Sequence, residues 1–160
     1  MTQTRAASTA HREIVLEDHL VEQLVVRQGY RQRQPDHYDR TSALDKALVL
    51  EFVQGTQADE WAKLVAHYAR SAEDEFFKQL DRALKQRGTL DVLRNGLKLI
   101  PGLKFALCTF KPASGLNAEL NRLFAANVLS VIRQVRYSLK NENAIDVVLF
   151  VNGLPAPRWN

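Results

Sequence analysis

Two carboxylates in this sequence could hold a metal ion, and the first is Asp146. It follows the polar turn at residues 140–143 and comes directly before the apolar run at residues 147–151. A carboxylate beside a buried strand loses hydration, and a bound metal ion is one way to offset that loss. An aspartate in this place can instead bond to its own backbone in a turn. Asp146 is therefore a candidate metal ligand, with a turn-forming aspartate as the alternative.

The second candidate is Glu17, which lies between Leu16 and Leu20 in a stretch with helical spacing. A glutamate here could also be a structural residue, because the dipole at a helix N-terminus favours acids. Glu13 lies four residues earlier and shares a side of the helix with Glu17. The spacing does not decide which of Glu13, Glu17 and Glu22 faces a cleft.

Basic side chains near Asp146 are candidates for contact with an anionic partner. The chain carries a formal net charge of +4, and this mild basicity suits nucleic acid without requiring it. Arg133, Arg136 and Lys140 lie just before Asp146, and a strand period of two puts Arg133 and Arg136 on opposite faces. One of these faces could contact DNA phosphates. The alternative is a solvated strand edge.

The sequence lacks the residues that several other kinds of chemistry require. The sequence has no glycine-rich phosphate loop, no paired cysteines and no zinc-binding His-Glu-x-x-His helix, and its four histidines show no ligand spacing. The single cysteine, Cys108, cannot form an internal disulfide and reads as a core residue, which favours a reducing cytoplasm. No stretch is apolar enough for a membrane span or a signal peptide. We therefore expect a cytoplasmic protein without thiol catalysis.

Helices are expected to fill the first ninety or so residues. Apolar residues at spacings of three and four predict a helix at 13–28, and Gly29 ends it. The polar stretch at 31–40 reads as a loop. Thr41 or Ser42 can cap a second helix through residue 53, with Asp45 in its first turn. A longer helical region at 59–86, broken near Ser71, and a short one at 90–97 follow.

Strands dominate the remainder. Residues 102–110 resemble a strand, Asn117 can cap a short helix, and residues 128–138 alternate with the period of a strand. The final strand covers residues 145–151, which places Asp146 at its start. The fold class is therefore α/β in the broad sense (α+β), with an N-terminal helical layer packed on a small, mixed sheet.

Blocks spread along the chain resemble the N-terminal nuclease region of the restriction (R) subunit of type I restriction–modification enzymes. They are residues 16–24 with Gly29-Tyr30, Tyr38-Asp39-Arg40 with Ala43-Leu44-Asp45, 87–94, 110–117, 127–137 and 146–155. Together they are specific, although no single block would be. The resemblance extends from residue 13 to residue 155.

The resemblance implies a restriction-endonuclease-like core of the PD-(D/E)xK type. In such cores a helix acid and a strand aspartate hold Mg²⁺, and a second strand carries Glu-x-Lys. Asp146 matches the strand aspartate and Glu17 the helix acid. Mg²⁺ prefers oxygen ligands and would activate the attacking water. The family further implies double-stranded DNA as substrate, an ATP-driven motor outside this region, and M and S subunits as partners.

The sequence departs from the family pattern at its end. Counting from Asp146, the glutamate of Glu-x-Lys falls on Asn160, and the lysine position lies beyond it. We therefore expect a disordered tail at 1–12, a partial nuclease domain at 13–155 and an aberrant tail at 156–160, with an incomplete sheet. The fragment should be inactive as a nuclease. The alternatives are a noncatalytic DNA-binding or subunit-interaction module, and a degraded pseudogene product without function.

Overall fold

The computed structural model describes residues 2–136, 139–141 and 144–156, with side chains described from His11 onward. Its secondary structure combines a helical layer with two small sheets, so the α+β class expected from the sequence is confirmed. Among the described helices, none is long and apolar enough to cross a bilayer. Residues 157–160, most of the expected aberrant tail, lie outside the described part of the chain.

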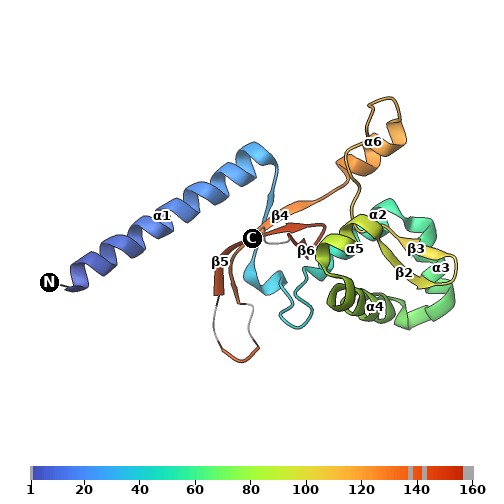
Figure 1. The fold of residues 1–160 in the computed structure, drawn as a ribbon, viewed down its shortest axis with the longest axis horizontal. Helices are drawn as coiled ribbons and strands as arrows, with labels where there is room; N and C mark the ends of the chain where they lie inside the picture. The colour runs from blue at the N-terminus through green and yellow to red at the C-terminus, as the bar shows by residue number, and fades with distance from the viewer. Residues whose placement is uncertain (1, 137–138, 142–143, 157–160) are drawn as a thin grey trace.

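The first helix, α1 (Thr2–Gln28), projects from the rest of the molecule with the N-terminus at its far end (Figure 1). It begins well before the predicted start at Glu13, so residues 2–12 are helical where we expected a disordered tail. Positions 6, 7 and 10 are alanines, the strongest helix formers, and no glycine or proline interrupts the chain before Gly29. The expected stop is confirmed, because Gly29 has a φ of 71°.

A helical layer and a β-hairpin follow. The layer comprises α2 (Lys46–Thr56), α3 (Ala58–Tyr68), the 3-10 turn η2 (Ala69–Ser71), α4 (Ala72–Arg87) and α5 (Thr89–Asn95). The break near Ser71 is confirmed. The cap of α2 is Asp45 rather than Thr41 or Ser42, because the Asp45 carboxylate accepts from the Leu48 amide. Of the predicted strand at 102–110, only β3 (Leu103–Phe105) is a strand, and it forms a hairpin with β2 (Leu97–Ile100), which was not predicted.

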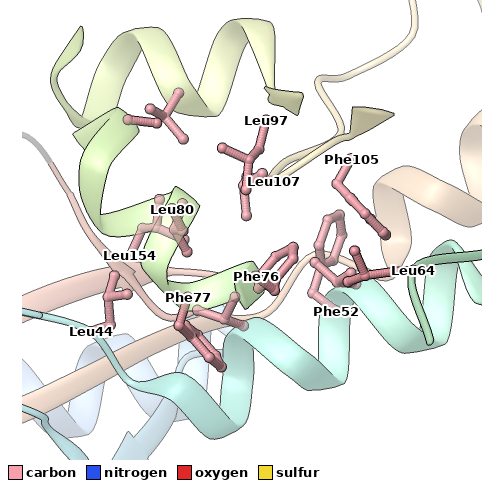
Figure 2. Packing of buried hydrophobic residues seen from close by; sticks show 14 of the residues in the cluster. Leu44, Phe52, Leu64, Phe76, Phe77, Leu80, Leu97, Phe105, Leu107 and Leu154 are labelled. Carbon is pink, nitrogen blue, oxygen red and sulfur yellow. The ribbon is translucent and has the colours of Figure 1, made fainter. Parts of the chain in front are cut away.

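The main hydrophobic core lies between these helices and the hairpin. Phe52, Phe76 and Phe105 are buried there, and Phe76 and Phe105 pack edge to face with ring centroids 5.4 Å apart. Figure 2 shows Phe52, Phe76 and Leu64 meeting across this core. Burial of such side chains contributes about 2 kcal/mol or more each, so this core supplies the rigid base of the molecule.

The second sheet carries the candidate site. Its order is β1 (Arg31–Arg33), β4 (Leu129–Arg136), β5 (Ala144–Val151), β6 (Leu154–Pro155). β1 runs parallel to β4, while β4–β5 and β5–β6 are antiparallel. The stretch expected to be a loop at 31–40 therefore contributes β1 and the 3-10 turn η1 (Pro35–His37). The last two residues of the predicted strand 128–138 lie outside the described residues.

The short helix α6 (Ala118–Ala125) precedes β4, and its predicted cap is confirmed. The Asn117 side chain accepts a hydrogen bond from the Leu120 amide at 3.0 Å. A second asparagine, Asn152, is fully buried at the end of β5. It accepts from the Val128 amide at 2.6 Å and donates to the Leu107 carbonyl at 3.0 Å. Asn152 thus links the start of β4 to the chain that follows the hairpin.

Candidate functional site

Asp146 is the third residue of β5, and its side chain is exposed. It lies between the cross-strand pairs Arg133–Val147 and Val135–Ile145, which places it opposite Gln134. The Gln134 side-chain amide donates to Asp146 Oδ1 at 3.3 Å. The predicted strand aspartate is therefore at the start of a strand and solvent-accessible, and it accepts a hydrogen bond from the neutral amide of Gln134.

Gln134 adopts an unusual backbone for its residue type. Its φ is 54°, in the left-handed region, although it lies within β4. A non-glycine residue in this region costs on the order of 1 kcal/mol, and such residues cluster at functional positions. No local sequence signal predicts this conformation, because glutamine has no preference for positive φ.

Glu17 lies in α1 and faces β4. Arg133 donates from one terminal nitrogen to Glu17 Oε2 at 3.2 Å and from the other to Asp18 Oδ1 at 2.5 Å. These two carboxylates, Glu17 first, raise the pKa of the Arg133 guanidinium. Glu17 is half-buried, with 18% of its side chain exposed, whereas Glu13 and Glu22 are exposed. Of the three glutamates in the predicted helix, Glu17 is the one that packs toward the sheet.

The two candidate metal ligands are not brought together by any described contact. Val147 pairs with Arg133, so their side chains share a face of the β4–β5 ladder, and that face meets Glu17. Successive residues of a strand point to opposite faces, so Asp146 points away from this face. In the described part of the chain, no group of three or more His, Cys, Asp or Glu side chains could hold a metal ion.

The predicted DNA-binding residues are also separated. Arg133 is held by the two acids of α1, and its Nε is buried without a hydrogen bond to any described residue. Arg136 instead lines a cavity with Pro35, Asp36, Tyr38, Arg40 and Gln134. Lys140 is exposed in the segment after β4. The structure thus separates a basic residue that fixes α1 from basic residues that face solvent.

Tyr38 and Arg40 were not among the predicted site residues. Tyr38 packs edge to face on Phe150 with ring centroids 6.0 Å apart, and burial raises the pKa of its hydroxyl. The signal for both was their position in a polar stretch containing aromatic and basic residues. What the sequence could not show is that β1 pairs in parallel with β4 and so brings η1 beside Gln134 and Arg136.

A buried ion pair anchors this sheet to the helical layer. Arg33 of β1 donates to both oxygens of Asp45, at 2.8 and 3.1 Å, and Asp45 is fully buried. The hydrogen bond to Asp45 raises the pKa of Arg33. Asp45 also donates its backbone amide to the Gly153 carbonyl at 2.9 Å. Direct contacts therefore hold β1, the start of α2 and the turn after β5 together.

Comparison with known proteins identifies the chain at the family level. No curated protein and no solved structure matched it. The model of the family described as the type I restriction enzyme R protein N terminus matches residues 11–156. This match covers most of the 160 residues, including Glu17, Gln134 and Asp146. The chain therefore belongs to the family of N-terminal regions of type I restriction enzyme R proteins.

Proposed function

We propose that this chain is the DNA-binding portion of the nuclease region of a restriction R subunit. Membership in the R-protein family over residues 11–156 carries this proposal. In support, the strand acid Asp146 is exposed beside a cavity that contains Arg40 and Arg136. A solvent-accessible carboxylate next to cations that can hold phosphates is the arrangement expected where a phosphodiester is cut.

Magnesium does not fit the described residues as they stand. Asp146 and Glu17 point to different faces of the β4–β5 ladder, and Arg133 occupies the Glu17 carboxylate. We therefore derive no catalytic step through a metal from these residues. For the intact enzyme we propose Mg²⁺-dependent cleavage of double-stranded DNA in a restriction-endonuclease-like core, with Asp146 as one oxygen ligand. The ATP-driven motor and the contacts to M and S subunits belong to this proposal for the intact enzyme.

The 160-residue chain alone should bind DNA without cutting it. It contains no glutamate or lysine after Asp146, so the transition-state contacts of a Glu-x-Lys strand are missing. Incubation of supercoiled plasmid with the purified chain and Mg²⁺ or Mn²⁺ should give no nicked product. The same protein should retard duplex DNA on a gel at low salt and release it as salt rises.

An Asp146→Asn variant provides the matched control for this experiment. Nicking by the parent chain that disappears in Asp146→Asn would show that the chain is a nuclease by itself. If there is no nicking and no retardation at low salt, the DNA-binding proposal is wrong. A subunit-interaction module would then be the better account, because α1 exposes several large apolar side chains.

A further inference from the structure

The cavity beside Gln134 joins three segments that are distant in sequence. η1 supplies Pro35 and Asp36, the following residues supply Tyr38 and Arg40, and β4 supplies Gln134 and Arg136. Its volume is about 510 Å³, which falls in the range of small-molecule sites and would admit a phosphate together with its sugar.

The chemistry of this lining favours an anion. Two guanidinium groups, from Arg40 and Arg136, face one carboxylate, that of Asp36. Asp36 has 85% of its side chain exposed, so water screens its charge. Guanidinium groups present paired N–H donors that match the oxygens of a phosphate. Tyr38 also lines the cavity, and burial raises the pKa of its hydroxyl, so this group is protonated at neutral pH and can donate a hydrogen bond.

Gln134 connects this lining to the strand acid. It lines the cavity, and its side-chain amide donates to Asp146 Oδ1. The left-handed φ of Gln134 sets the direction of this side chain at a cost in backbone energy. The surrounding structure holds that conformation through the pairs Arg133–Val147 and Val135–Ile145 on either side. A strained residue that contacts both the cavity and the acid indicates a functional constraint at this point.

One lining residue of the cavity, Tyr38, is held by packing and by the contacts of its neighbour in sequence. Tyr38 packs on Phe150, and Phe150 belongs to a small buried cluster with Ile132 and Val135. Asp39, next to Tyr38, accepts from the Ser42 hydroxyl and from Lys46 at 2.8 Å each. A ligand would therefore meet groups that are already positioned, which lowers the entropic cost of binding.

We propose that this cavity binds a phosphodiester group of a nucleic-acid backbone, with Arg40 and Arg136 as its cations and Gln134 linking it to Asp146. The proposal rests on the proposed function and makes it specific, because it places one backbone phosphate within reach of the strand acid. It also changes which basic residues contact DNA. Arg133 pairs with the acids of α1, and Arg40 replaces it as a cation of the DNA site.

Fluorescence anisotropy of a labelled duplex, titrated with the full chain at several salt concentrations, tests the assignment of the two arginines. Arg40→Gln and Arg136→Gln should each weaken binding several-fold and lower the salt slope by about one. Arg122→Gln is the matched control, because Arg122 lies on α6 in an exposed pair with Glu119. Circular dichroism establishes that each variant is folded. Arg136→Lys, which keeps the charge, should retain the salt slope.

If the parent chain binds DNA but Arg40→Gln and Arg136→Gln behave like Arg122→Gln, the cavity proposal fails and the proposed function stands. If the parent chain does not bind at low salt, both fail. Nuclear magnetic resonance of the Gln134 side-chain amide gives an independent readout. Its resonances should shift with a dinucleoside phosphate and not with inorganic phosphate at the same concentration. An equal shift with inorganic phosphate would overturn the assignment to a nucleic-acid backbone.

Discussion

At the scale of single residues, Asp39 shows how the loop before α2 is held. Its carboxylate accepts from Lys46 Nζ at 2.8 Å, from the Ser42 hydroxyl at 2.8 Å and from the Thr41 amide at 3.0 Å. The Lys46 interaction is the largest cause of a lowered Asp39 pKa, which falls to about 2. This loop connects Tyr38, which lines the cavity, to α2.

Stability should depend on the charge of Asp39 in acid. Its folded pKa lies below the ordinary aspartate value of about 4, so its contribution is complete above that pH and is lost as pH falls toward 2. The side chain is 31% exposed, so solvent screening reduces the effect to on the order of 1 kcal/mol. Urea unfolding of the parent and Asp39→Asn should differ at pH 6 and converge near pH 2. An equal difference at both pH values would contradict this.

Gly153 allows a second prediction at this scale. Its φ is 81°, and a Cβ built there would lie 2.3 Å from the Asp45 carbonyl oxygen and 2.8 Å from the Val49 amide nitrogen. Gly153→Ala should therefore lower the free energy of unfolding by about 2 to 5 kcal/mol, through backbone strain and overpacking.

Gly55 is the matched control, because it lies in α2 with open space around its Cα. Gly55→Ala should raise the free energy of unfolding by about 0.5 to 1 kcal/mol. Urea titrations of both variants measure these changes. A Gly153→Ala protein as stable as the parent would mean that the turn does not pack against α2 as described.

At the scale of elements, the sequence predicted the helices better than the sheet. Helical spacing, Gly29, Asn117 and the break near Ser71 are local signals, and they agreed with the structure. β1 was missed because it has three polar residues and gains its hydrogen bonds from β4, about one hundred residues away. A parallel pairing of this kind leaves no local pattern to read.

The sequence predicted residues of the candidate site but not how their side chains are arranged in space. Asp146 was recognised because an acid before an apolar run is unusual, and its place at the start of β5 agreed with the expectation. Which face of a strand a side chain occupies in the fold depends on how the strands pair, and the sequence does not specify this. The ion pairs of Arg133 with Glu17 and Asp18 were therefore not predicted. Whether Asp146 and Glu17 bind metal stays a prediction.

The attachment of α1 to β4 gives the prediction at this scale. Arg133→Met removes both charged hydrogen bonds to α1 while keeping much of the side-chain volume. We expect opening of α1 to become about 1 kcal/mol easier, about a fivefold gain in amide exchange rate. Hydrogen exchange read by mass spectrometry measures this for peptides of α1. Arg122→Met should leave α1 exchange unchanged, and equal exchange in the two variants would refute the link.

At the scale of the whole molecule, apolar surface is distributed unevenly. The helical layer and the hairpin bury one large hydrophobic cluster, and a smaller cluster lies on the sheet around Phe150. In contrast, α1 buries Val21 but leaves Leu16 and Val26 at 68% and 74% exposure. Exposed apolar side chains gathered on one element favour association with other surfaces.

The isolated chain should therefore self-associate reversibly as its concentration rises. Replacement of Leu16 and Val26 together by glutamine should shift the sedimentation velocity profile toward monomer, because it removes apolar area from contact between molecules. Leu116→Gln is the control, since Leu116 is 94% exposed in a loop away from α1. A parent chain that sediments as a monomer at all concentrations would contradict the prediction.

The length of α1 has a mechanical consequence. Arg133 fastens the helix at Glu17 and Asp18, and the segment from there to Thr2 is about 22 Å long at 1.5 Å per residue. A rotation of ten degrees about that fastening would swing the far tip by about 4 Å. Gln134 is the next residue after Arg133 along β4. A small twist of β4 at the cavity would therefore produce a larger displacement at the N-terminal end of α1.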